Sequence, residues 1–464
     1  MDILLTHGYF LTLDEAEKRV MKPYPPLGLL YISSHLKARG FDVEVLDNTF
    51  LDLTSAEATL TEKAPRLVGL YVNLMTRKNA LKLIAKCKEI GAIVVLGGPE
   101  PSNYVHEYLS RGADIVVSGE GERALEELIP HIAKHGLNRL TEIRGIYFKG
   151  EHEEILSTAP RAQIENLDAQ PFPDRAAIDL EQYLDTWQRH HHVRSVSLIT
   201  ARGCPYPCAW CSHSVYGRTH RRRSPKNVAD EIARVREAYR PDQLWYADDV
   251  FTINPKWLER YAAELKRRKL DYPFETITRE DRLNEATVRT LAEMGCYRLW
   301  IGAESGSQRI LDGMDRRTDG VRMREMIALV KRHGIRAGTF IMVGYDGETW
   351  DDLNATAHHL RGAAPDDVLT TLSYPIKGTP YYDLVADRVI PTKAWEEGSD
   401  RDLTIRGRNS RRFYGHTQRW LRAEAELARV KDGTASWRSL VKARAASVIS
   451  RMGMYATRNE VEHG

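Results

Sequence analysis

Sulfur is scarce in this chain of 464 residues, which has five cysteines and ten methionines. Five thiols without a paired framework argue against a secreted, disulfide-stapled protein and favour a reducing compartment, where thiols stay free to bind metal. No run of about 18 apolar residues occurs, so the sequence predicts no membrane span. The N-terminal stretch MDILLTHG also lacks the basic flank and long apolar segment of a signal peptide. We therefore expect a cytoplasmic protein.

A strong excess of one charge is also missing. The formal net charge is +3, which is too small to indicate a nucleic-acid partner. Residues 401–464 hold 14 Lys/Arg and 6 Asp/Glu, a net charge of +8, and residues 1–400 carry −5. The basic character therefore lies in the C-terminal tail. The length and an ordinary globular composition predict two or three domains, most simply those of an enzyme.

Short apolar runs alternate with amphipathic stretches in residues 1–135, the first predicted domain. Strands are predicted at 3–6, 43–46, 67–72, 93–96 and 114–117, and helices at 27–39, 55–62, 79–90, 104–110 and 123–134. This alternation predicts an α/β fold, a doubly wound, Rossmann-like parallel sheet with helices on both faces. No G-x-G-x-x-G follows the first strand, which argues against a nicotinamide site.

Glycines and polar residues gather where these strands end, the edge at which such sheets bind ligands. A glycine there lets the backbone approach a flat or phosphorylated ligand closely, although any single glycine could simply make a tight turn. The candidate binding residues are Pro26, Gly28, Asp47, Asn73, Met75, Thr76, Gly97, Gly98, Gly119, Glu120, Gly121 and Glu122.

Three stretches of this domain, PYPPLGLLYISSHLKARGFDVEVLDN, VVLGGPEPS and ADIVVSGEGE, resemble the cobalamin-binding domain that precedes many radical S-adenosylmethionine (SAM) enzymes. The resemblance implies that the candidate residues above bind cobalamin. Better-known cobalamin proteins carry D-x-H-x-x-G after the first strand, and here the turn from Thr6 to Phe10 lacks that motif. The family resemblance then implies cobalamin with its own base displaced, no histidine on cobalt, and the loop 73–76 over the lower face of the ring.

Residues 136–190 break the alternation and are predicted to be a linker. Within it, 143–148 and 153–156 indicate a small hairpin, and Pro171 to Asp174 indicates an extended connection. The run of His190, His191 and His192 is a weak metal candidate, because adjacent side chains point in different directions on a regular backbone.

Three of the five cysteines, Cys204, Cys208 and Cys211, lie within eight residues. At this spacing three thiolates can bind three corners of a [4Fe-4S] cluster and leave one iron open for the amino and carboxylate groups of SAM. Trp210 lies where an aromatic ring could pack on the adenine. The pattern C-x3-C-x-aromatic-C resembles the signature of the radical SAM superfamily, which implies a catalytic cluster held by these cysteines. The alternative is structural zinc with His213 as a fourth ligand, although zinc sites usually use two ligand pairs separated by a longer knuckle.

Residues 191–385 repeat βα units. Strands are predicted at 196–200, 244–246, 274–278, 298–302, 337–343 and 368–374, and helices at 225–239, 255–268, 284–294, 321–333 and 349–360. Six units predict a partial (β/α)6 barrel with its active site at the carboxyl ends of the strands.

Four residues at the carboxyl ends of these strands are candidates for SAM binding. We expect Glu304 near the ammonium, Arg279 near the carboxylate, and Ser305 together with Glu304 near the ribose. Asp248 is a fourth candidate. The stretches YADDVF, ITRED, IGAESGSQRIL, MVGYDGET and YPIKGTPYY resemble the same enzyme class. One departure is Asp346, which stands where that class commonly has proline.

The resemblance covers roughly residues 1–380 and implies three cofactors, namely a [4Fe-4S] cluster, SAM and cobalamin. The reaction it favours moves a methyl group from SAM, through cobalamin, to an unactivated carbon of a small-molecule or lipid-like substrate. An electron donor such as flavodoxin or ferredoxin is then required. The nearest alternative is an oxidative cyclase or rearrangement enzyme similar to the magnesium-protoporphyrin ester cyclases, without methyl transfer. A third is a non-catalytic cobalamin-binding sensor with structural zinc.

Two helical candidates occupy the C-terminal region, residues 386–464. One carries Trp420, Ala423, Leu427 and Val430 at helical spacing, and the other carries Trp437, Leu440, Val441, Val448, Ile449 and Met452. The favoured interpretation is that both helices cap the barrel while their arginines face water. The alternative is peripheral contact with a membrane surface, where a basic amphipathic helix can lie.

Overall fold

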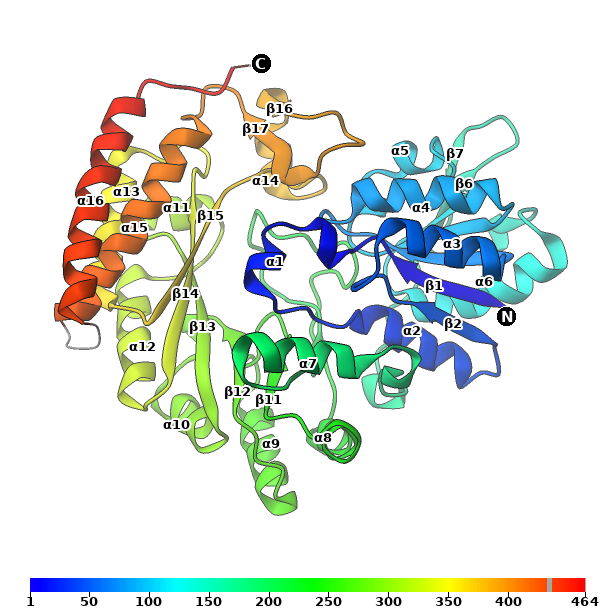
Figure 1. Cartoon of the computed structure of the whole chain (residues 1–464), viewed down its shortest axis with the longest axis horizontal. Coiled ribbons are helices and arrows are strands. Elements are labelled where there is room, and N and C mark those ends of the chain that lie inside the picture. Colours follow the sequence, from blue (N-terminus) through cyan, green and yellow to red (C-terminus); the bar gives the residue numbers. More distant parts are fainter. Residues whose placement is uncertain (432–435, 464) are drawn as a thin grey trace.

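The computed structural model describes residues 1–431 and 436–463. A first α/β domain lies beside a second, and the C-terminal helices cover the far side of the second (Figure 1). The first sheet has the strand order β2-β1-β3-β4-β5-β6-β7. Its five parallel strands are β1 (Ile3–His7), β2 (Val43–Leu46), β3 (Leu67–Tyr71), β4 (Ile93–Gly97) and β5 (Ile115–Val117).

Helices cover both faces of this sheet, each with its own buried core. On one face α2 (Leu27–Lys37) and α6 (Gly121–His135) pack on the strands. On the other face lie α3 (Leu53–Lys63), α4 (Arg77–Glu89) and α5 (Val105–Leu109). The predicted doubly wound architecture is confirmed.

The hairpin expected in the linker belongs to this sheet. Its strands β6 (Ile146–Lys149) and β7 (Ile155–Ser157) pair antiparallel, and β6 adds to the free edge of β5 with Phe148 opposite Ile115. Ile146 and Phe148 are buried and alternate with partly exposed neighbours, so β6 extends the core face of the sheet. The sheet therefore reaches residue 157, past the predicted boundary at residue 135.

The second domain is an open barrel of six parallel strands in sequential order. They are β8 (Ser195–Leu198), β11 (Gln243–Tyr246), β12 (Phe274–Thr278), β13 (Cys296–Glu304), β14 (Arg336–Val343) and β15 (Asp367–Leu372). The helices between them are α8 (Pro225–Tyr239), α9 (Pro255–Arg268), α10 (Glu285–Glu293), α11 (Gln308–Gly313), α12 (Gly320–Arg332) and α13 (Trp350–Ala363). Ser224 and Asn254 cap α8 and α9, and a proline follows each cap, which explains why those helix starts were predictable. The (β/α)6 prediction is confirmed.

The C-terminal region continues with α14 (Pro380–Val385), the strand pair β16 (Val389–Pro391) and β17 (Leu403–Ile405), then α15 (Arg411–Lys431) and α16 (Trp437–Thr457). Helix α15 packs on α13, β14 and β15 and buries Phe413, Trp420 and Leu421. The capping interpretation is therefore correct for α15.

For α16 the capping interpretation is wrong. Its buried side chains are mostly small, namely Ala443, Ser447, Ser450, Met454 and Thr457. The large apolar side chains of the helix instead face solvent. Within the described residues no helix is both long and apolar enough to cross a membrane.

Candidate functional site

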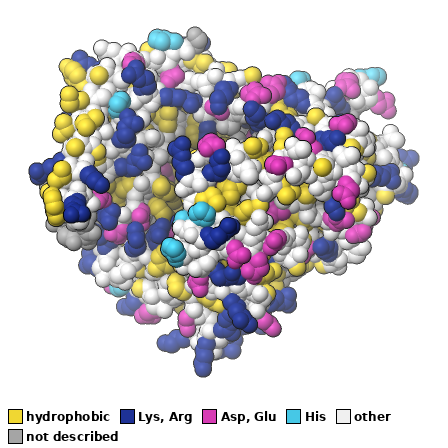
Figure 2. Space-filling model, viewed as in Figure 1, with side chains coloured by type: hydrophobic (Ala, Val, Ile, Leu, Met, Phe, Trp, Pro, Cys, Tyr) yellow, Lys and Arg dark blue, Asp and Glu magenta, His cyan; other side chains and the backbone are white. Residues whose placement is uncertain are grey.

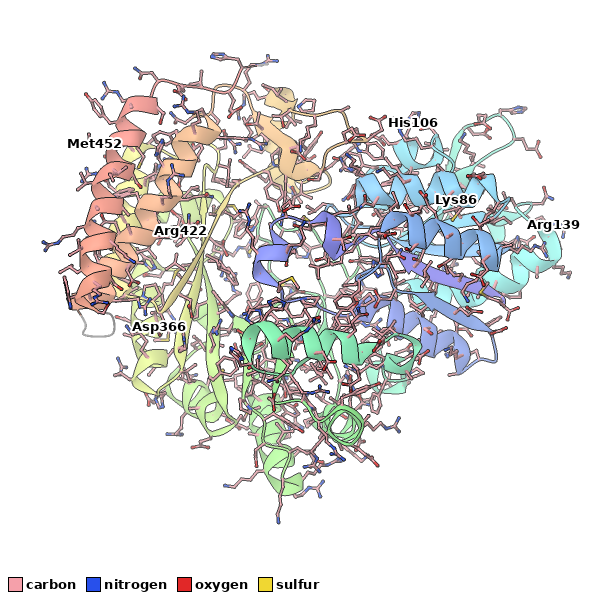
Figure 3. The ribbon with its side chains drawn as sticks, in the orientation of Figure 1. Lys86, His106, Arg139, Asp366, Arg422 and Met452 are labelled. Atoms are coloured by element: carbon pink, nitrogen blue, oxygen red, sulfur yellow. The ribbon has the colours of Figure 1, made fainter. Side chains whose placement is uncertain are left out.

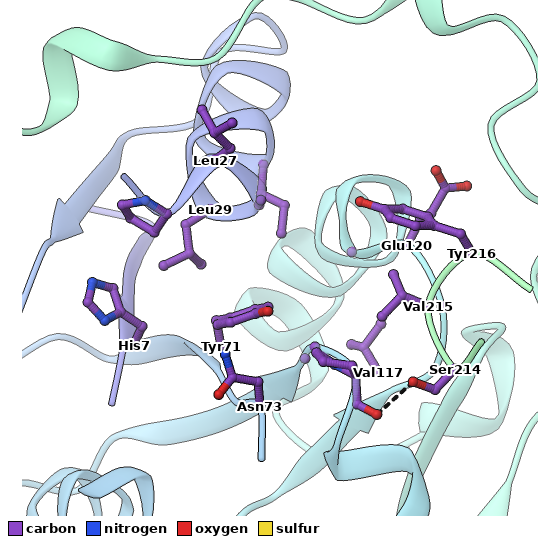
Figure 4. A pocket seen from close by; sticks show the side chains of 18 of the residues that line it. His7, Leu27, Leu29, Tyr71, Asn73, Val117, Glu120, Ser214, Val215 and Tyr216 are labelled. Carbon is purple, nitrogen blue, oxygen red and sulfur yellow. Dashed lines mark hydrogen bonds between the residues drawn. The ribbon is translucent and has the colours of Figure 1, made fainter. Parts of the chain in front are cut away.

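A cavity of about 540 Å³ lies between the two domains, at the carboxyl edge of the first sheet. Figure 4 shows side chains from both domains around it, including His7, Tyr71 and Asn73 on one side and Ser214 and Tyr216 on the other. Twelve residues singled out from the sequence line it: Pro26, Gly28, Asn73, Thr76, Gly97, Gly98, Gly119, Glu120, Gly121, Glu122, Cys204 and His213. Asp47 and Met75, also expected there, are not part of its lining.

The glycines after β4 shape the wall of the cavity. Gly98 has a φ of +107°, and a Cβ there would lie 2.3 Å from the carbonyl oxygen of Val72. A side chain is therefore excluded at Gly98 by strain and by space. At Gly97 a Cβ would meet nothing within 4 Å, so this backbone presents a bare surface. Such a wall fits a broad flat ligand such as a corrin ring.

His7 at the end of β1 lines the cavity, but both of its ring nitrogens are engaged. The backbone N–H of Tyr9 donates to Nδ1 at 3.1 Å. Nε2 pairs with the Asp47 carboxylate at 2.9 Å and also lies 3.3 Å from the backbone N–H of Asn48. The hydroxyl of Tyr183 donates to the other oxygen of Asp47 at 2.7 Å. Burial opposes ionisation of Asp47, but the bonds from His7 and Tyr183 outweigh it and lower its pKa. Asp47 thus orients His7 from behind the cavity, and His7 has no free nitrogen for a metal.

The loop after β3 presents only part of itself to the cavity. Asn73 and Thr76 line it and bond to each other, since the Asn73 N–H donates to the Thr76 hydroxyl at 3.0 Å. The side-chain oxygen of Asn73 accepts from the Met75 N–H at 2.9 Å. The Met75 side chain is 42% exposed and points elsewhere. Asn73 and Thr76 are therefore the loop residues placed to face a cofactor.

Glu120 and Glu122 line the cavity with their carboxylates tied to the second domain. Arg202 binds Glu120 at 2.7 Å and Glu122 at 2.6 Å, and Arg221 binds Glu120 at 2.8 Å. Arg202, Glu120 and Glu122 are buried, so removing any one of them would leave an uncompensated charge between the domains. Their proposed contact with a cofactor stays a prediction.

The cysteine loop is anchored at both ends. The short strands β9 (Ala201–Arg202) and β10 (Arg221–Arg222) pair antiparallel and close it. In its middle, the Ala209 N–H donates to the Met314 carbonyl and the Ala209 carbonyl accepts from the Tyr381 N–H, both at 2.9 Å. Trp210 packs on the apolar cluster that contains the stacked pair Tyr345 and Tyr381. The loop is therefore held in shape by protein contacts alone.

The three thiols of the loop influence one another. Burial raises the pKa of Cys204 to about 11. Desolvation of the sulfur, then Asp249 and the other two thiols, raise the pKa of Cys211 to about 12, although the residue as a whole is exposed. Burial also raises the pKa of Cys208, against the opposing effect of the Arg279 guanidinium 3.7 Å from its sulfur. Such a cluster of three thiols is a suitable donor set for iron.

For the zinc alternative, His213 lines the cavity with its Nε2 atom buried and without a hydrogen-bond partner. Across residues 1–431 and 436–463, no three or more His, Cys, Asp or Glu side chains are grouped closely enough to hold a single metal ion, and this includes Cys204, Cys208 and Cys211.

Two acidic groups and Arg279 meet at the ends of β12 and β13. Glu304 has a φ of +63° next to a break in strand register, a strained backbone of the kind found at binding sites. Burial and the neighbouring Glu280 raise the pKa of Glu304 to about 8, although Arg279 opposes the shift. Burial raises the pKa of Glu280 to about 7. Both Glu280 oxygens lack a hydrogen-bond partner, and its ion pair with Arg316 is long, at 3.8 Å. An unsatisfied buried acid such as Glu280, with Glu304 near it, fits a cationic ligand such as SAM.

Sequence reasoning missed Glu280, although it lies in the quoted stretch ITRED and directly follows Arg279. Ser305, by contrast, is fully buried and bonds to Thr356 and to the N–H of Ser307. Ser305 therefore supports the turn after β13. Like Arg279, Glu280 and Glu304, it is not part of the lining of the 540 Å³ cavity.

Asp248 and Asp249 have different surroundings. Asp248 is buried and accepts from the N–H of Thr200 at 2.7 Å and from Arg222 at 2.9 Å. Asp249 is exposed where it lines the cavity, and partial desolvation there together with the charge of Asp248 raises its pKa. Asp248 is therefore a structural carboxylate. The acid that faces the site is Asp249, which we did not single out from the sequence.

The described geometry agrees with the comparisons with known proteins. Residues 19–129 match the model of the B12 binding domain, and residues 198–360 match that of the Radical SAM superfamily. An uncharacterized methyltransferase from Pyrococcus horikoshii is 28% identical over 404 residues, which cover 85% of this chain and 86% of that protein. The anaerobic magnesium-protoporphyrin IX monomethyl ester cyclase from Synechocystis is 25% identical, with 78% and 73% covered.

A solved structure has the same fold over nearly the whole chain. The cobalamin-dependent S-adenosylmethionine radical enzyme OxsB, solved with aqua-cobalamin bound, superimposes with a TM-score of 0.74 at 18% identity. The likeness covers 98% of this chain and 72% of OxsB.

Proposed function

Because the chain belongs to the cobalamin-dependent radical SAM enzymes, we propose that it is a methyltransferase that moves a methyl group from SAM to an unactivated carbon. The observation that carries the proposal is the shared cavity. Gly98, on the glycine wall of the first sheet, and Cys204, in the cysteine loop, line the same space. Two cofactors held there would face each other across the substrate.

Each group of residues has a distinct role in this proposal. Cys204, Cys208 and Cys211 hold the cluster, and their thiols lose protons when they bind iron. Glu280, Glu304 and Arg279 bind the charged groups of SAM, while the bare backbone at Gly97 and Gly98, with Asn73 and Thr76, holds the corrin. When bound, the cluster with SAM supplies a radical and cobalamin supplies a methyl carrier.

The test needs no knowledge of the substrate. The protein is reconstituted without oxygen with iron, sulfide and cobalamin, and is then given a reductant and SAM labelled in its methyl group. We expect label in the corrinoid fraction together with S-adenosylhomocysteine, and slow formation of 5′-deoxyadenosine. Deoxyadenosine without label transfer would contradict the methyltransferase proposal.

The second candidate function is oxidative cyclisation without methyl transfer. It is favoured by the cyclase from Synechocystis, whose identity to this chain is close to that of the methyltransferase from Pyrococcus horikoshii. The label experiment separates the two, because the cyclase hypothesis predicts deoxyadenosine but no labelled corrinoid.

The remaining parts of the proposal concern partners and location. The substrate is a small molecule, and a lipid-like one is the finer form of this proposal. The electron donor is a flavodoxin or ferredoxin, and the location is the cytoplasm with peripheral contact to a membrane through the basic C-terminal helices. The five cysteines, which form no disulfide, are compatible with that compartment.

A further inference from the structure

Helix α16 carries an apolar stripe on its solvent side. Five side chains follow one another at steps of three, four or seven residues and so share one face. They are Trp437, Val441, Val448, Met452 and Tyr455, and each is between 58% and 69% exposed. Ile449, beside them, is 66% exposed. Figure 2 shows hydrophobic side chains along the edge of the molecule where α16 lies, and Figure 3 labels Met452 on its outer side. The stripe runs the length of the helix, about 30 Å for 21 residues.

The orientation of α16 is held by tight packing and is not a chance exposure. The buried face is built of small residues, and a Cβ on Gly453 would lie 2.2 Å from a ring nitrogen of His416 on α15. The hydroxyl of Ser447 donates to Glu424 of α15 at 2.6 Å, in a buried contact. Apart from the buried Met454, the seam holds only small side chains, and the stripe lies on the opposite face and points outward.

The charges of α16 select the kind of partner. The helix contains Arg438, Lys442, Arg444 and Arg451, all exposed, and no Asp or Glu. In the part of the chain that the structure describes, none of these four forms an ion pair with a carboxylate. Two copies packed through this stripe would bring like charges together, which disfavours self-association. A lipid surface with anionic headgroups accounts for both features, because the apolar stripe can be buried among acyl chains while the cations bind the headgroups.

We propose that α16 docks on an anionic phospholipid bilayer, with its stripe at the boundary between headgroups and acyl chains. Trp437 and Tyr455 lie near the two ends of the stripe and are the aromatic types that favour this boundary. This proposal specifies the membrane contact that the proposed function includes, and it rests on the proposed function for its class of partner. Docking on the bilayer requires neither SAM nor an electron donor.

The test is co-sedimentation of the full-length chain with sucrose-loaded vesicles of phosphatidylglycerol and phosphatidylcholine in equal parts. We expect binding to these vesicles and little binding to pure phosphatidylcholine. Raising the ionic strength from about 0.1 M to about 1 M shortens the screening length from about 10 Å to about 3 Å and should release most of the protein. Equal recovery in the supernatant with and without anionic lipid would overturn the proposal.

A matched pair of variants separates the stripe from general surface apolarity. Val448→Gln with Met452→Gln should weaken binding about tenfold, whereas Val321→Gln with Leu384→Gln should leave it unchanged. Val321 and Leu384 are 57% and 59% exposed, close to Val448 at 58%. An equal loss of vesicle binding in both double variants would overturn the proposal. So would a wild-type protein that is a dimer in solution and becomes a monomer when Val448 and Met452 are replaced. Unchanged melting temperatures verify folding, and because no turnover is measured, docking and methyl transfer can fail separately.

Discussion

Arg77 in α4 and Asp400, before β17, are 323 residues apart in the chain and form a buried ion pair at 2.7 Å between Nη2 and Oδ1. Arg77 also binds Glu100 and lies over the ring of Trp395, which belongs to the same C-terminal segment as Asp400. Tyr104 donates to Asp400 at 2.6 Å. The first domain is thus fastened to the segment that follows the barrel.

Removing this carboxylate should destabilise the protein strongly. Asp400→Ala leaves Arg77 with one fewer buried partner, and we expect a loss of about 3 kcal/mol in the free energy of unfolding. Urea denaturation measures it. The control is Glu396→Ala, which removes an exposed partner of Arg111 from the same segment and should cost less than about 1 kcal/mol. Equal losses of unfolding free energy in the two variants would show that the buried ion pair contributes no more to stability than the exposed one.

The cluster assignment predicts a cysteine-specific loss of iron. Cys208→Ala should abolish iron binding and cleavage of SAM after anaerobic reconstitution, since a [4Fe-4S] cluster would retain only two protein ligands. Cys87→Ala, a change in the core of the first domain, should keep the iron content of the wild type. Iron analysis and visible absorbance measure both. Full iron content in the Cys208 variant would refute the assignment.

The backbone wall predicts a glycine-specific loss of cobalamin. Gly98→Ala forces a Cβ against the Val72 carbonyl in a left-handed conformation, so the wall must shift and we expect at least a tenfold weaker affinity for aqua-cobalamin. Gly320→Ala at the start of α12 has no contact closer than 4.0 Å and serves as the control. Spectrophotometric titration measures both affinities, and equal values would contradict the role of Gly98.

The hydrogen bonds of His7 predict that it does not ligate cobalt. Electron paramagnetic resonance of the cob(II)alamin-loaded protein should lack the splitting from an axial nitrogen, and His7→Gln should leave that pattern unchanged. A nitrogen splitting that disappears in the His7 variant would show that the Asp47 contact breaks when cofactor binds.

Two neighbouring acids should respond differently to the same change. Asp248→Asn removes a charge that Arg222 and two backbone N–H groups need, and we expect a stability loss of about 2 kcal/mol. Asp249→Asn removes an exposed charge that lines the cavity and should leave the melting temperature close to wild type while it lowers turnover. Label transfer and thermal melts together test the pair. An Asp248 variant with wild-type stability and low turnover would contradict the structural role assigned to Asp248 and place it in the site instead.

Most of the fold was predictable because periodicity and helix caps are local signals. The six barrel strands and the capped helices α8 and α9 lie where residue spacing places them. The pairing of β6 with β5 could not be predicted, because it depends on which edge of the sheet is free. The outward stripe of α16 was missed for a related reason, since spacing reveals a face but not the side that meets the protein.

The site shows the same division between local and tertiary information. The cysteine loop and the glycines can be identified from residue type alone, because few other residues can replace them. Asp248 and Asp249 are indistinguishable in sequence, and only the position of Arg222 decides which one is neutralised. Glu280 became visible only once its oxygens proved to be buried without hydrogen-bond partners.

The charged contacts between the domains have a consequence for how a corrinoid enters and leaves. The cavity has walls from both domains, and Arg202 with Glu120 and Glu122 closes one margin of it. Opening that margin breaks these charge-assisted hydrogen bonds together, because both carboxylates bind the same guanidinium, so the two domains have to part in one cooperative step. The corrinoid should accordingly exchange slowly and remain as a resident group through many cycles, so regeneration has to happen in place.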